Sequence, residues 1–311
     1  MTACTGSLER GYVSRSRLVD AMLAGTVLLW ALNITVTKYL ISHGWSPLAY
    51  GTIRYFLAIV LFAAYTYRRE RSFAIARRDV KLVLLAGGLI FGNQVCFVYG
   101  LKFTQASTVG LMLGATPMFI GAISASLGLE RLGRAFWVGA IVTVIGVGCI
   151  ALSSGHVDSR PKGVFLAIAL ALTWSAYSIA IAPMMRRYSP FRISTLVLAT
   201  GWLPLAVLGA HQVATQDLSF GWLPWVAFGY AVIGPLFLTN VLWFTAIDRV
   251  GPSRAALFAN FEPFLAVLFA VVLLSDRLYA MEILGAVLIL GGIVLERVWH
   301  QSTASAMSAL D

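Results

Sequence analysis

LKFTQASTVGLMLGATPMFIGAISASLGLERL, residues 101–132, occurs in the chain a second time in related form. Shifted by 146 positions, residues 247–278 read IDRVGPSRAALFANFEPFLAVLFAVVLLSDRL. Each copy opens on a charged turn, continues as an apolar helix interrupted by proline, and closes on an acidic residue followed by Arg and Leu. Such self-similarity predicts two halves of one architecture. The register gives the pairs Ser107 with Ser253, Pro117 with Pro263, Glu130 with Asp276, and Arg131 with Arg277.

The composition places the chain in a membrane. Of its 311 residues 59% are hydrophobic and 12% are charged, and the mean hydropathy is +0.83, so one soluble core could not bury its apolar surface. The three cysteines, Cys4, Cys96 and Cys149, are scattered, so we expect neither a disulfide framework, nor a metal site, nor a cofactor. The net charge of +10 is spread over many loops, so the expected partner is the lipid bilayer and not nucleic acid.

Apolar runs of membrane-spanning length recur along the chain, which predicts an all-α polytopic membrane protein with ten transmembrane helices. The expected spans cover residues 19–41, 47–67, 80–101, 106–129, 134–152, 163–185, 191–210, 222–247, 253–274 and 278–298. They divide the chain into an N-terminal segment (1–18), a first repeat (19–152), a polar linker (153–162), a second repeat (163–298) and a tail (299–311).

Basic residues are unevenly distributed between the two sides of these spans. Seventeen Lys and Arg residues fall on the side of both termini, and four, Lys102, Arg160, Lys162 and Arg277, fall on the other. By the positive-inside rule, both termini are expected in the cytoplasm. Because five spans is an odd number, the second half must enter the membrane from the opposite side, which predicts two inverted five-helix repeats. Inverted repeats are typical of transporters that open alternately on each face.

The paired motifs resemble a known family. LKFTQAS and GLERL in the first half, AIDRVGPSRAAL and LLSDRL in the second, and the two prolines are similar to the duplicated EamA domain of the drug/metabolite transporter superfamily. The similarity covers nearly the whole chain and is greatest to bacterial amino-acid and metabolite exporters, including the YddG-type aromatic amino-acid exporters. The resemblance implies ten helices in a basket, a central cavity lined mainly by the first, third, fourth, sixth, eighth and ninth helices, and export of small solutes across the cell inner membrane.

Polar residues inside a span should face the bundle interior or a wet cavity, because unsatisfied polar atoms are costly in hydrocarbon. Thr26, Trp30, Asn33 and Thr37 recur on one face of the first span, and Trp174 matches Trp30 in the sixth. Amides bind polar groups and aromatic faces hold apolar or cationic ones. The alternative is that the tryptophans are interfacial and the amides only join helices. The expected substrate-binding residues are Trp30, Asn33, Asn93, Gln94, Trp174, Tyr177, Asn240 and Trp243.

Three charged residues lie inside expected spans. Lys38 is near a span end, where snorkelling explains it. Arg54 is expected to have a structural role, with binding of an anionic group as the alternative. Glu262 is expected mid-helix, directly before Pro263, and is a candidate for proton coupling; alternatively, it satisfies backbone groups that the proline loosens.

Proline and glycine recur at matched positions of the two halves. Pro117 and Pro263 each remove a mid-helix hydrogen bond, so they are candidate hinges for alternating access, or static kinks. Glycines of the fifth and tenth spans indicate close helix packing, either within one chain or between two copies in a homodimer.

Together, these features predict a secondary transporter that exports small amphipathic metabolites, amino acids and aromatic ones among them, by alternating access through a central cavity. One alternative is an exchanger of phosphate compounds or nucleotide sugars, whose cavity would carry several basic residues. An intramembrane enzyme is disfavoured, because Glu262 is not accompanied by a convergent acid, histidine or metal set. No GxxxxGK[ST] loop occurs, so the energy is expected from a gradient or from the substrate itself.

Overall fold

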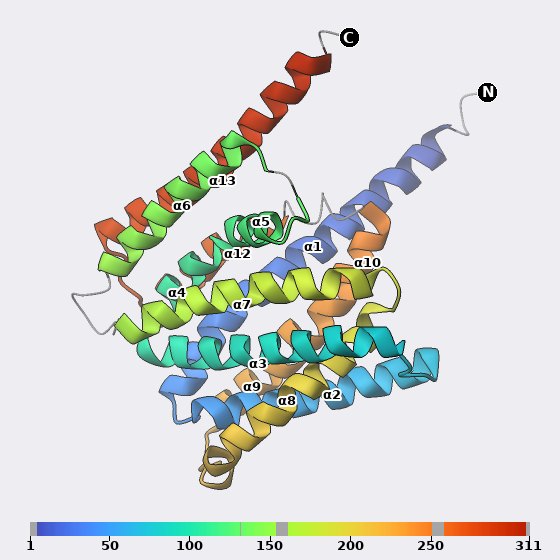
Figure 1. The fold of residues 1–311 in the computed structure, drawn as a ribbon. Coiled ribbons are helices and arrows are strands. Elements are labelled where there is room, and N and C mark those ends of the chain that lie inside the picture. The colour runs from blue at the N-terminus through green and yellow to red at the C-terminus, as the bar shows by residue number, and fades with distance from the viewer. Residues whose placement is uncertain (1–4, 131, 154–160, 251–257, 309–311) are drawn as a thin grey trace.

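The computed structural model describes residues 5–130, 132–153, 161–250 and 258–308, which are helical apart from turns and short connections (Figure 1). The all-α class is thereby confirmed for the described residues. In chain order the elements are α1 (Thr5–Ser42), α2 (Pro47–Glu70), η1 (Arg77–Asp79), α3 (Val80–Phe103), α4 (Ala106–Leu113), α5 (Thr116–Ser126), α6 (Arg134–Ser153), α7 (Pro161–Met185), α8 (Pro190–Ala214), α9 (Trp222–Val232), η2 (Ile233–Leu238), α10 (Thr239–Val250), α12 (Glu262–Leu274) and α13 (Ala280–Ser308).

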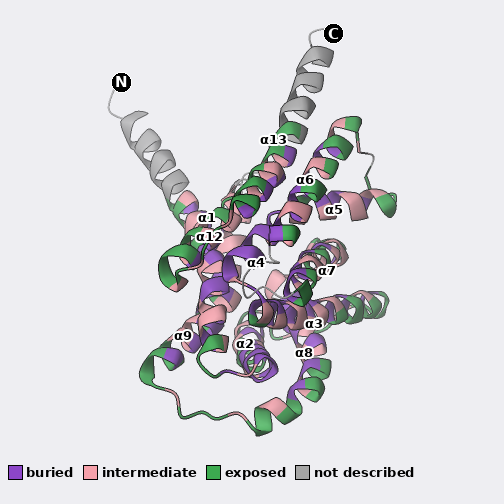
Figure 2. Cartoon of the chain, turned by 90° about the vertical axis from the view of Figure 1, so that its left-hand side faces the viewer, coloured by how far each residue is buried: buried purple, intermediate pink, exposed green. Residues whose placement is uncertain are grey.

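These helices are those of a multi-span membrane protein. Seven described helical segments of 20 to 27 residues have the length and apolar composition of a membrane span, and α4 with α5 forms an eighth that is bent by 41°. Two shorter apolar helices, α12 and residues 280–295 of α13, complete the ten expected segments. Aliphatic side chains such as Val144 (61% exposed) and Val272 (66% exposed) point outward, and Figure 2 shows green exposed patches along α6 and α13.

The two proline-containing helices of the repeat are broken, where the sequence predicted one helix with a bend at proline. α4 and α5 are separated by residues 114–115, and in the second half a turn at residues 260–261 precedes α12. Each break directly precedes the start of the helix that carries Pro117 or Pro263 at its second position. Proline has no N–H to donate and its ring clashes with the carbonyl four residues earlier, which accounts for both breaks. Residues 251–257, including Ser253 of the repeated motif, lie outside the described residues.

Other boundaries also differ from expectation. The eighth expected span is continuous in space but consists of α9, the π-helix η2 and α10. α1 begins at Thr5 rather than at residue 19, and α13 continues to Ser308 rather than ending at residue 298. The first and last helices therefore extend beyond the apolar runs from which their ends were predicted.

Contacts between helices repeat when the two halves are exchanged. α2 packs against its counterpart α8 and α6 against its counterpart α13, and α4 of the fourth expected span packs against α12 of the ninth. α1 contacts α9, α10 and α12 of the second half, just as α7 contacts α3, α4 and α5 of the first. Each half therefore covers the apolar faces of the other, so the chain forms one interlocked bundle.

The two halves run through the bundle in opposite directions. We name the side where α1 begins the terminal side and the opposite side the distal side. α1 ends beside the end of α3, because Lys38 Nζ donates hydrogen bonds of 2.8 Å to the carbonyls of both Leu101 and Thr104. α7 begins on this distal side, where Pro161 and Phe103 line one surface hollow. The repeats are thus inverted, and α1 begins on the side where α13 ends (Figure 1).

A buried carboxylate joins the two halves on the terminal side. Asp79, which is 1% exposed, accepts a hydrogen bond from the Tyr188 hydroxyl at 2.7 Å and pairs with Arg187 Nη1 at 2.8 Å. Tyr188 and Arg187 lie in the turn between α7 and α8, whereas Asp79 ends η1. This cluster fixes the α2–α3 connection of the first half against the second.

Replacing Arg187 with Gln is expected to lower the free energy of unfolding by about 1–2 kcal/mol, because the Asp79 carboxylate loses its cation while the Arg187 side chain is partly exposed. Thermal unfolding of the purified protein in detergent measures the effect. The control is Arg186→Gln, which removes a charge from an exposed neighbouring residue. Equal melting temperatures for the two variants would show that the Asp79 pair contributes no stability.

Candidate functional site

The polar face of α1 packs against the span formed by α9, η2 and α10. Trp30 Nε1 donates a hydrogen bond to Thr239 Oγ1 at 3.1 Å, and the Trp30 and Trp243 ring centroids are 5.1 Å apart. Nearby, the Tyr230 hydroxyl donates to the carbonyl of Leu29 at 2.7 Å. Two of the expected site residues, one from each half, therefore meet within the bundle.

The span that faces α1 is irregular because it contains Pro235. Proline lacks an N–H, so the carbonyl of Ala231, four residues earlier, loses its usual helical donor, and residues 233–238 form a π-helix. Such π segments are frequent at functional sites. Three side chains bind carbonyls around the break: Arg54 Nε binds Ala231 (3.0 Å), Thr239 Oγ1 binds Pro235 (2.7 Å) and Asn240 Nδ2 binds Leu236 (2.6 Å).

A chain of polar contacts leads from Asn33 to α2. Thr37 Oγ1 donates to Asn33 Oδ1 at 3.5 Å and lies 2.8 Å from the Tyr50 hydroxyl. Thr37 and Tyr50 are fully buried, whereas Asn33 is half-buried. Asn33 Nδ2 makes no hydrogen bond to the described residues, so its amide can still donate to a ligand.

Three of the other expected site residues, Asn93, Trp174 and Tyr177, form a second group at the contact between α3 and α7. Asn93 Nδ2 donates to the carbonyl of Leu170 at 3.0 Å and lies 3.3 Å from Thr173 Oγ1. On α7, the Trp174 and Tyr177 ring centroids are 5.5 Å apart, and Trp174 is 39% exposed. Asn93 therefore joins helices, which is the alternative role that the sequence left open.

No hydrogen bond or ring contact between described residues joins these two groups. The first group holds Trp30, Asn33, Asn240 and Trp243, and the second holds Asn93, Trp174 and Tyr177. Gln94 belongs to neither group, because its Nε2 lies against Gly51 of α2. The two groups occupy equivalent places in the two halves. α1 contacts the eighth expected span in the first group, and α7, the counterpart of α1, contacts α3 in the second. Whether both bind substrate stays a prediction.

Glu262 is not mid-helix, contrary to the expectation from sequence. It is the first residue of α12, immediately after the break at residues 260–261. The free N–H groups at a helix start favour a negative charge there. No described residue forms an ion pair or hydrogen bond with Glu262, and its counterpart Thr116 likewise starts α5.

The acidic residue of the repeated motif binds the other half. Asp276 Oδ2 accepts hydrogen bonds from both the backbone N and the Oγ of Ser107, each at 3.0 Å, at the start of α4. The carboxylate thereby satisfies a free N–H of that helix. The register predicts the mirror contact of Glu130 with Ser253, which lies outside the described residues.

Of the two cations inside the spans, Lys38 extends to the distal end of α3, and its snorkelling to the membrane surface stays a prediction. It binds the carbonyls at the end of α3, where a positive charge is favoured by the helix dipole. Arg54 has the structural role expected of it, since it binds the carbonyl of Ala231. Among the described residues, no three His, Cys, Asp or Glu side chains gather into a metal site.

Comparison with known proteins identifies the architecture. The sequence model of the EamA-like transporter family matches residues 17–152 and again residues 161–296, which together make up most of the chain. This protein belongs to the EamA-like transporter family. It is therefore a transporter of a small molecule across a membrane and not an enzyme.

Relatives of this EamA-like transporter include proteins named as exporters. It is 27% identical over 284 residues to a probable amino-acid metabolite efflux pump of Salmonella typhimurium, covering 86% of this chain and 91% of the relative. It is 30% identical over 192 residues to the aromatic amino acid exporter YddG of Ancylobacter novellus, covering 60% and 64%. A solved crystal structure matches with a TM-score of 0.62 at 21% identity, covering 92% of this chain and 98% of that one, which shows a shared fold.

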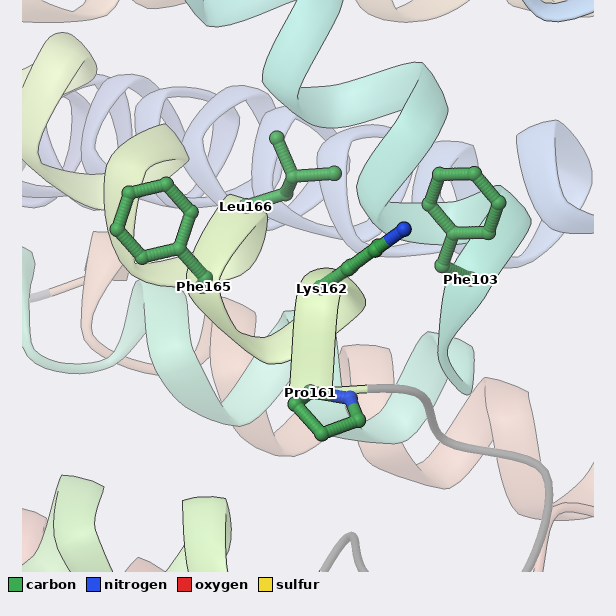
Figure 3. A pocket seen from close by; sticks show the side chains of 5 residues that line it. All are labelled: Phe103, Pro161, Lys162, Phe165 and Leu166. Atoms are coloured by element: carbon green, nitrogen blue, oxygen red, sulfur yellow. The ribbon is translucent and has the colours of Figure 1, made fainter.

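A surface hollow of about 420 Å³ on this EamA-like transporter lies away from both groups. It is lined by Phe103, Pro161, Lys162, Phe165 and Leu166, at the distal ends of α3 and α7 (Figure 3). Pro161 is 13 residues from Trp174, roughly 20 Å along α7 at 1.5 Å per residue. The hollow is therefore separate from the residues expected to bind substrate.

Sequence reasoning missed the part that Pro235 plays in this transporter. A proline inside the apolar run 222–247 signals a freed carbonyl, but it does not say which side chain supplies the donor. Arg54 and Thr239, which bind beside the π segment, come from two different helices. Tyr50 was also missed, because an aromatic residue near a span end looks like an interfacial one.

Proposed function

We propose that this EamA-like transporter exports small amphipathic metabolites, and amino acids with aromatic side chains among them. One observation carries the proposal: the Trp30 and Trp243 rings meet beside a π-helical break, and Asn33 and Asn240 lie three residues from these rings along α1 and α10. Paired rings suit an apolar side chain, and amides suit polar backbone groups. The names of the Salmonella and Ancylobacter relatives support the same substrate class.

Export would follow from exchanging the conformations of the two halves. Breaks precede both Pro117 and Pro263, so each half has a matched place at which its helix can bend. The excess of basic residues on the terminal side favours a cytoplasmic location for that side, so transport would run from the terminal to the distal side.

Counterflow in proteoliposomes tests the substrate class. Radiolabelled phenylalanine is expected to enter liposomes preloaded with unlabelled phenylalanine at a saturable rate, and empty liposomes give the background. Phosphoenolpyruvate and a nucleotide sugar are tested in the same assay, because they represent the substrates of the alternative exchanger. Saturable counterflow of phenylalanine that neither compound inhibits supports the proposal. Saturable counterflow of either compound, with no amino-acid flux, contradicts it.

Glu262 is our candidate for proton coupling, since it lies at a helix start without a partner among the described residues. Glu262→Gln is expected to abolish phenylalanine accumulation driven by a pH gradient while leaving counterflow within about twofold of the original rate. Counterflow needs no net proton movement, so the two readouts separate coupling from binding. Unchanged gradient-driven accumulation would remove Glu262 from the mechanism.

A further inference from the structure

Arg54 is a buried cation without a carboxylate partner. It is 3% exposed and lies seven residues after the start of α2, about 10 Å along the helix axis. Among the described residues, the ion pairs within 4 Å are those of Arg187 with Asp79 and Arg192 with Glu70, both on the terminal side. A buried charge is costly unless it is paired, and in membrane proteins it usually marks a functional position.

The structural role of Arg54 uses only part of the guanidinium. Its Nε donates to the carbonyl of Ala231, which Pro235 leaves without a helical donor. A neutral glutamine could supply such a donor without burying a charge. A guanidinium has five N–H donors arranged in a fork that matches a carboxylate. The hydrogen bond to Ala231 therefore does not explain why this position carries a permanent positive charge.

The surroundings of Arg54 supply donors and phenols rather than negative charge. Its Cζ lies 5.5 Å from the centre of the Tyr50 ring, and Tyr230 directly precedes Ala231, whose carbonyl Arg54 binds. Gln94, 2% exposed, has a buried Nε2 with no hydrogen-bond partner.

Gln94 approaches the same face of α2 as Arg54. A Cβ added to Gly51 would lie 3.0 Å from Gln94 Nε2, and Gly51 is three residues before Arg54, so both lie on one side of the helix. A guanidinium and an unpartnered amide N–H group thus face one region from α2 and α3. Both are donors, and what they lack is an acceptor that carries negative charge.

We propose that Arg54, assisted by Gln94, binds the carboxylate of the transported metabolite. The inference rests on the proposed function in that the ligand is a carboxylate-bearing metabolite. Tyr50 connects the two parts of the site, because its ring lies under Arg54 and its hydroxyl bonds Thr37, which bonds Asn33. The carboxylate would lie at Arg54, and the apolar part of the ligand would point toward the ring pair of α1 and α10.

The charge of this site favours a monocarboxylate over a phosphate compound. Lys38 lies four residues before the end of α1, and its ammonium binds two carbonyls of the α3 end. The positive charge at the proposed site is therefore that of Arg54. One guanidinium matches one carboxylate charge, whereas a phosphate monoester carries nearly two charges at pH 7.

The test separates ligand binding from the support of Ala231. Pro235→Ala restores a backbone N–H four residues after Ala231, so in this background Arg54→Gln removes the charge while the carbonyl keeps a donor. The readout is the thermal stabilisation of the purified full-length protein in detergent by phenylacetate and by its neutral isostere phenylacetamide. Phenylalanine with phenylalaninamide forms a second pair.

Phenylacetate is expected to bind at least about tenfold more tightly than phenylacetamide in both the original and the Pro235→Ala protein, as charge-assisted hydrogen bonds allow. In Pro235→Ala/Arg54→Gln this ratio is expected to fall to about one at an unchanged ligand-free melting temperature. In the Pro235→Ala background, Arg54→Lys should keep part of the preference. No preference in the original protein, or an unchanged preference in the double variant, overturns the proposal.

Flux measurements distinguish failure of this inference from failure of the proposed function. If carboxylate preference depends on Arg54 but no amino acid shows counterflow, the site stands and the amino-acid substrate class is wrong. If phenylalanine counterflow persists unchanged in Pro235→Ala/Arg54→Gln, the proposed function stands and Arg54 has only its structural role.

Discussion

Gly146→Leu is expected to lower the free energy of unfolding by about 3 kcal/mol or more, which is enough to prevent recovery of most of the protein in a folded state. α6 and α13 approach closely: a Cβ on Gly146 would lie 2.7 Å from the backbone oxygen of Gly285, and one on Gly285 would lie 2.5 Å from that of Gly146. Because the obstacle is backbone, no change of rotamer relieves the overlap. The helices would have to separate, which removes the dispersion contacts that hold membrane helices together.

The same helix offers a matched control. A Cβ on Gly148 meets no atom within 4 Å, so Gly148→Leu should leave the melting temperature unchanged or raise it, since leucine favours helix over glycine by up to about 1 kcal/mol. Gly292→Leu and Gly291→Leu form a second pair on α13, because a Cβ on Gly292 would lie 2.4 Å from Gly139 O and one on Gly291 meets nothing. Thermal melts with size-exclusion chromatography measure all four. Similar stability of Gly146→Leu and Gly148→Leu would show that the two backbones are not in close contact.

Trp30→Ala is expected to reduce phenylalanine counterflow by about tenfold or more. The change removes a ring that lies 5.1 Å from Trp243 and the N–H that binds Thr239. The ring pair is worth about 0.5–1.5 kcal/mol beyond its buried area, and the hydrogen bond about 1 kcal/mol. Because Thr239 in turn binds the carbonyl of Pro235, the π segment would also lose this hydrogen-bonded connection to α1.

Two further variants show whether the loss of counterflow in Trp30→Ala comes from the aromatic ring or from its N–H group. Trp30→Phe keeps an aromatic face but not the N–H, so counterflow is expected within a few-fold of the original, about 1 kcal/mol of binding. Trp137→Ala removes a tryptophan that is 48% exposed at the start of α6 and should leave transport unchanged. Normal counterflow in folded Trp30→Ala would exclude Trp30 from the transport site. Equal losses for Trp30→Phe and Trp30→Ala would assign the effect to the hydrogen bond.

The class of fold could be predicted from the sequence because it depends on properties that are local or repeated. An apolar run of about 20 residues has few alternatives to a membrane span, since its backbone polar groups must be satisfied internally. The 146-residue register divided the chain into corresponding halves, and the family match covers both. An odd number of spans per half is enough to predict inversion.

The helix breaks were only partly predictable. Prolines at positions 117 and 263 indicated weakened helices, but whether a proline gives a kink, a break or a π segment depends on which donors reach the freed carbonyls. Pro235 shows the difference, because its span stays continuous with Arg54 and Thr239 bound beside it. The break before Pro263 likewise places Glu262 at the start of a helix, whereas the sequence predicted a mid-helix position.

The membrane class, the two repeats, the family and most of the helices can therefore be read from the sequence. Only the tertiary structure decided that Asp276 binds Ser107, that Trp30 meets Trp243, and that Arg54 is buried without a carboxylate. The physical reason is distance along the chain: these partners belong to opposite halves, more than 150 residues apart. Helical periodicity reports which face of a helix is polar, but the residue that this face meets depends on how the two halves pack together.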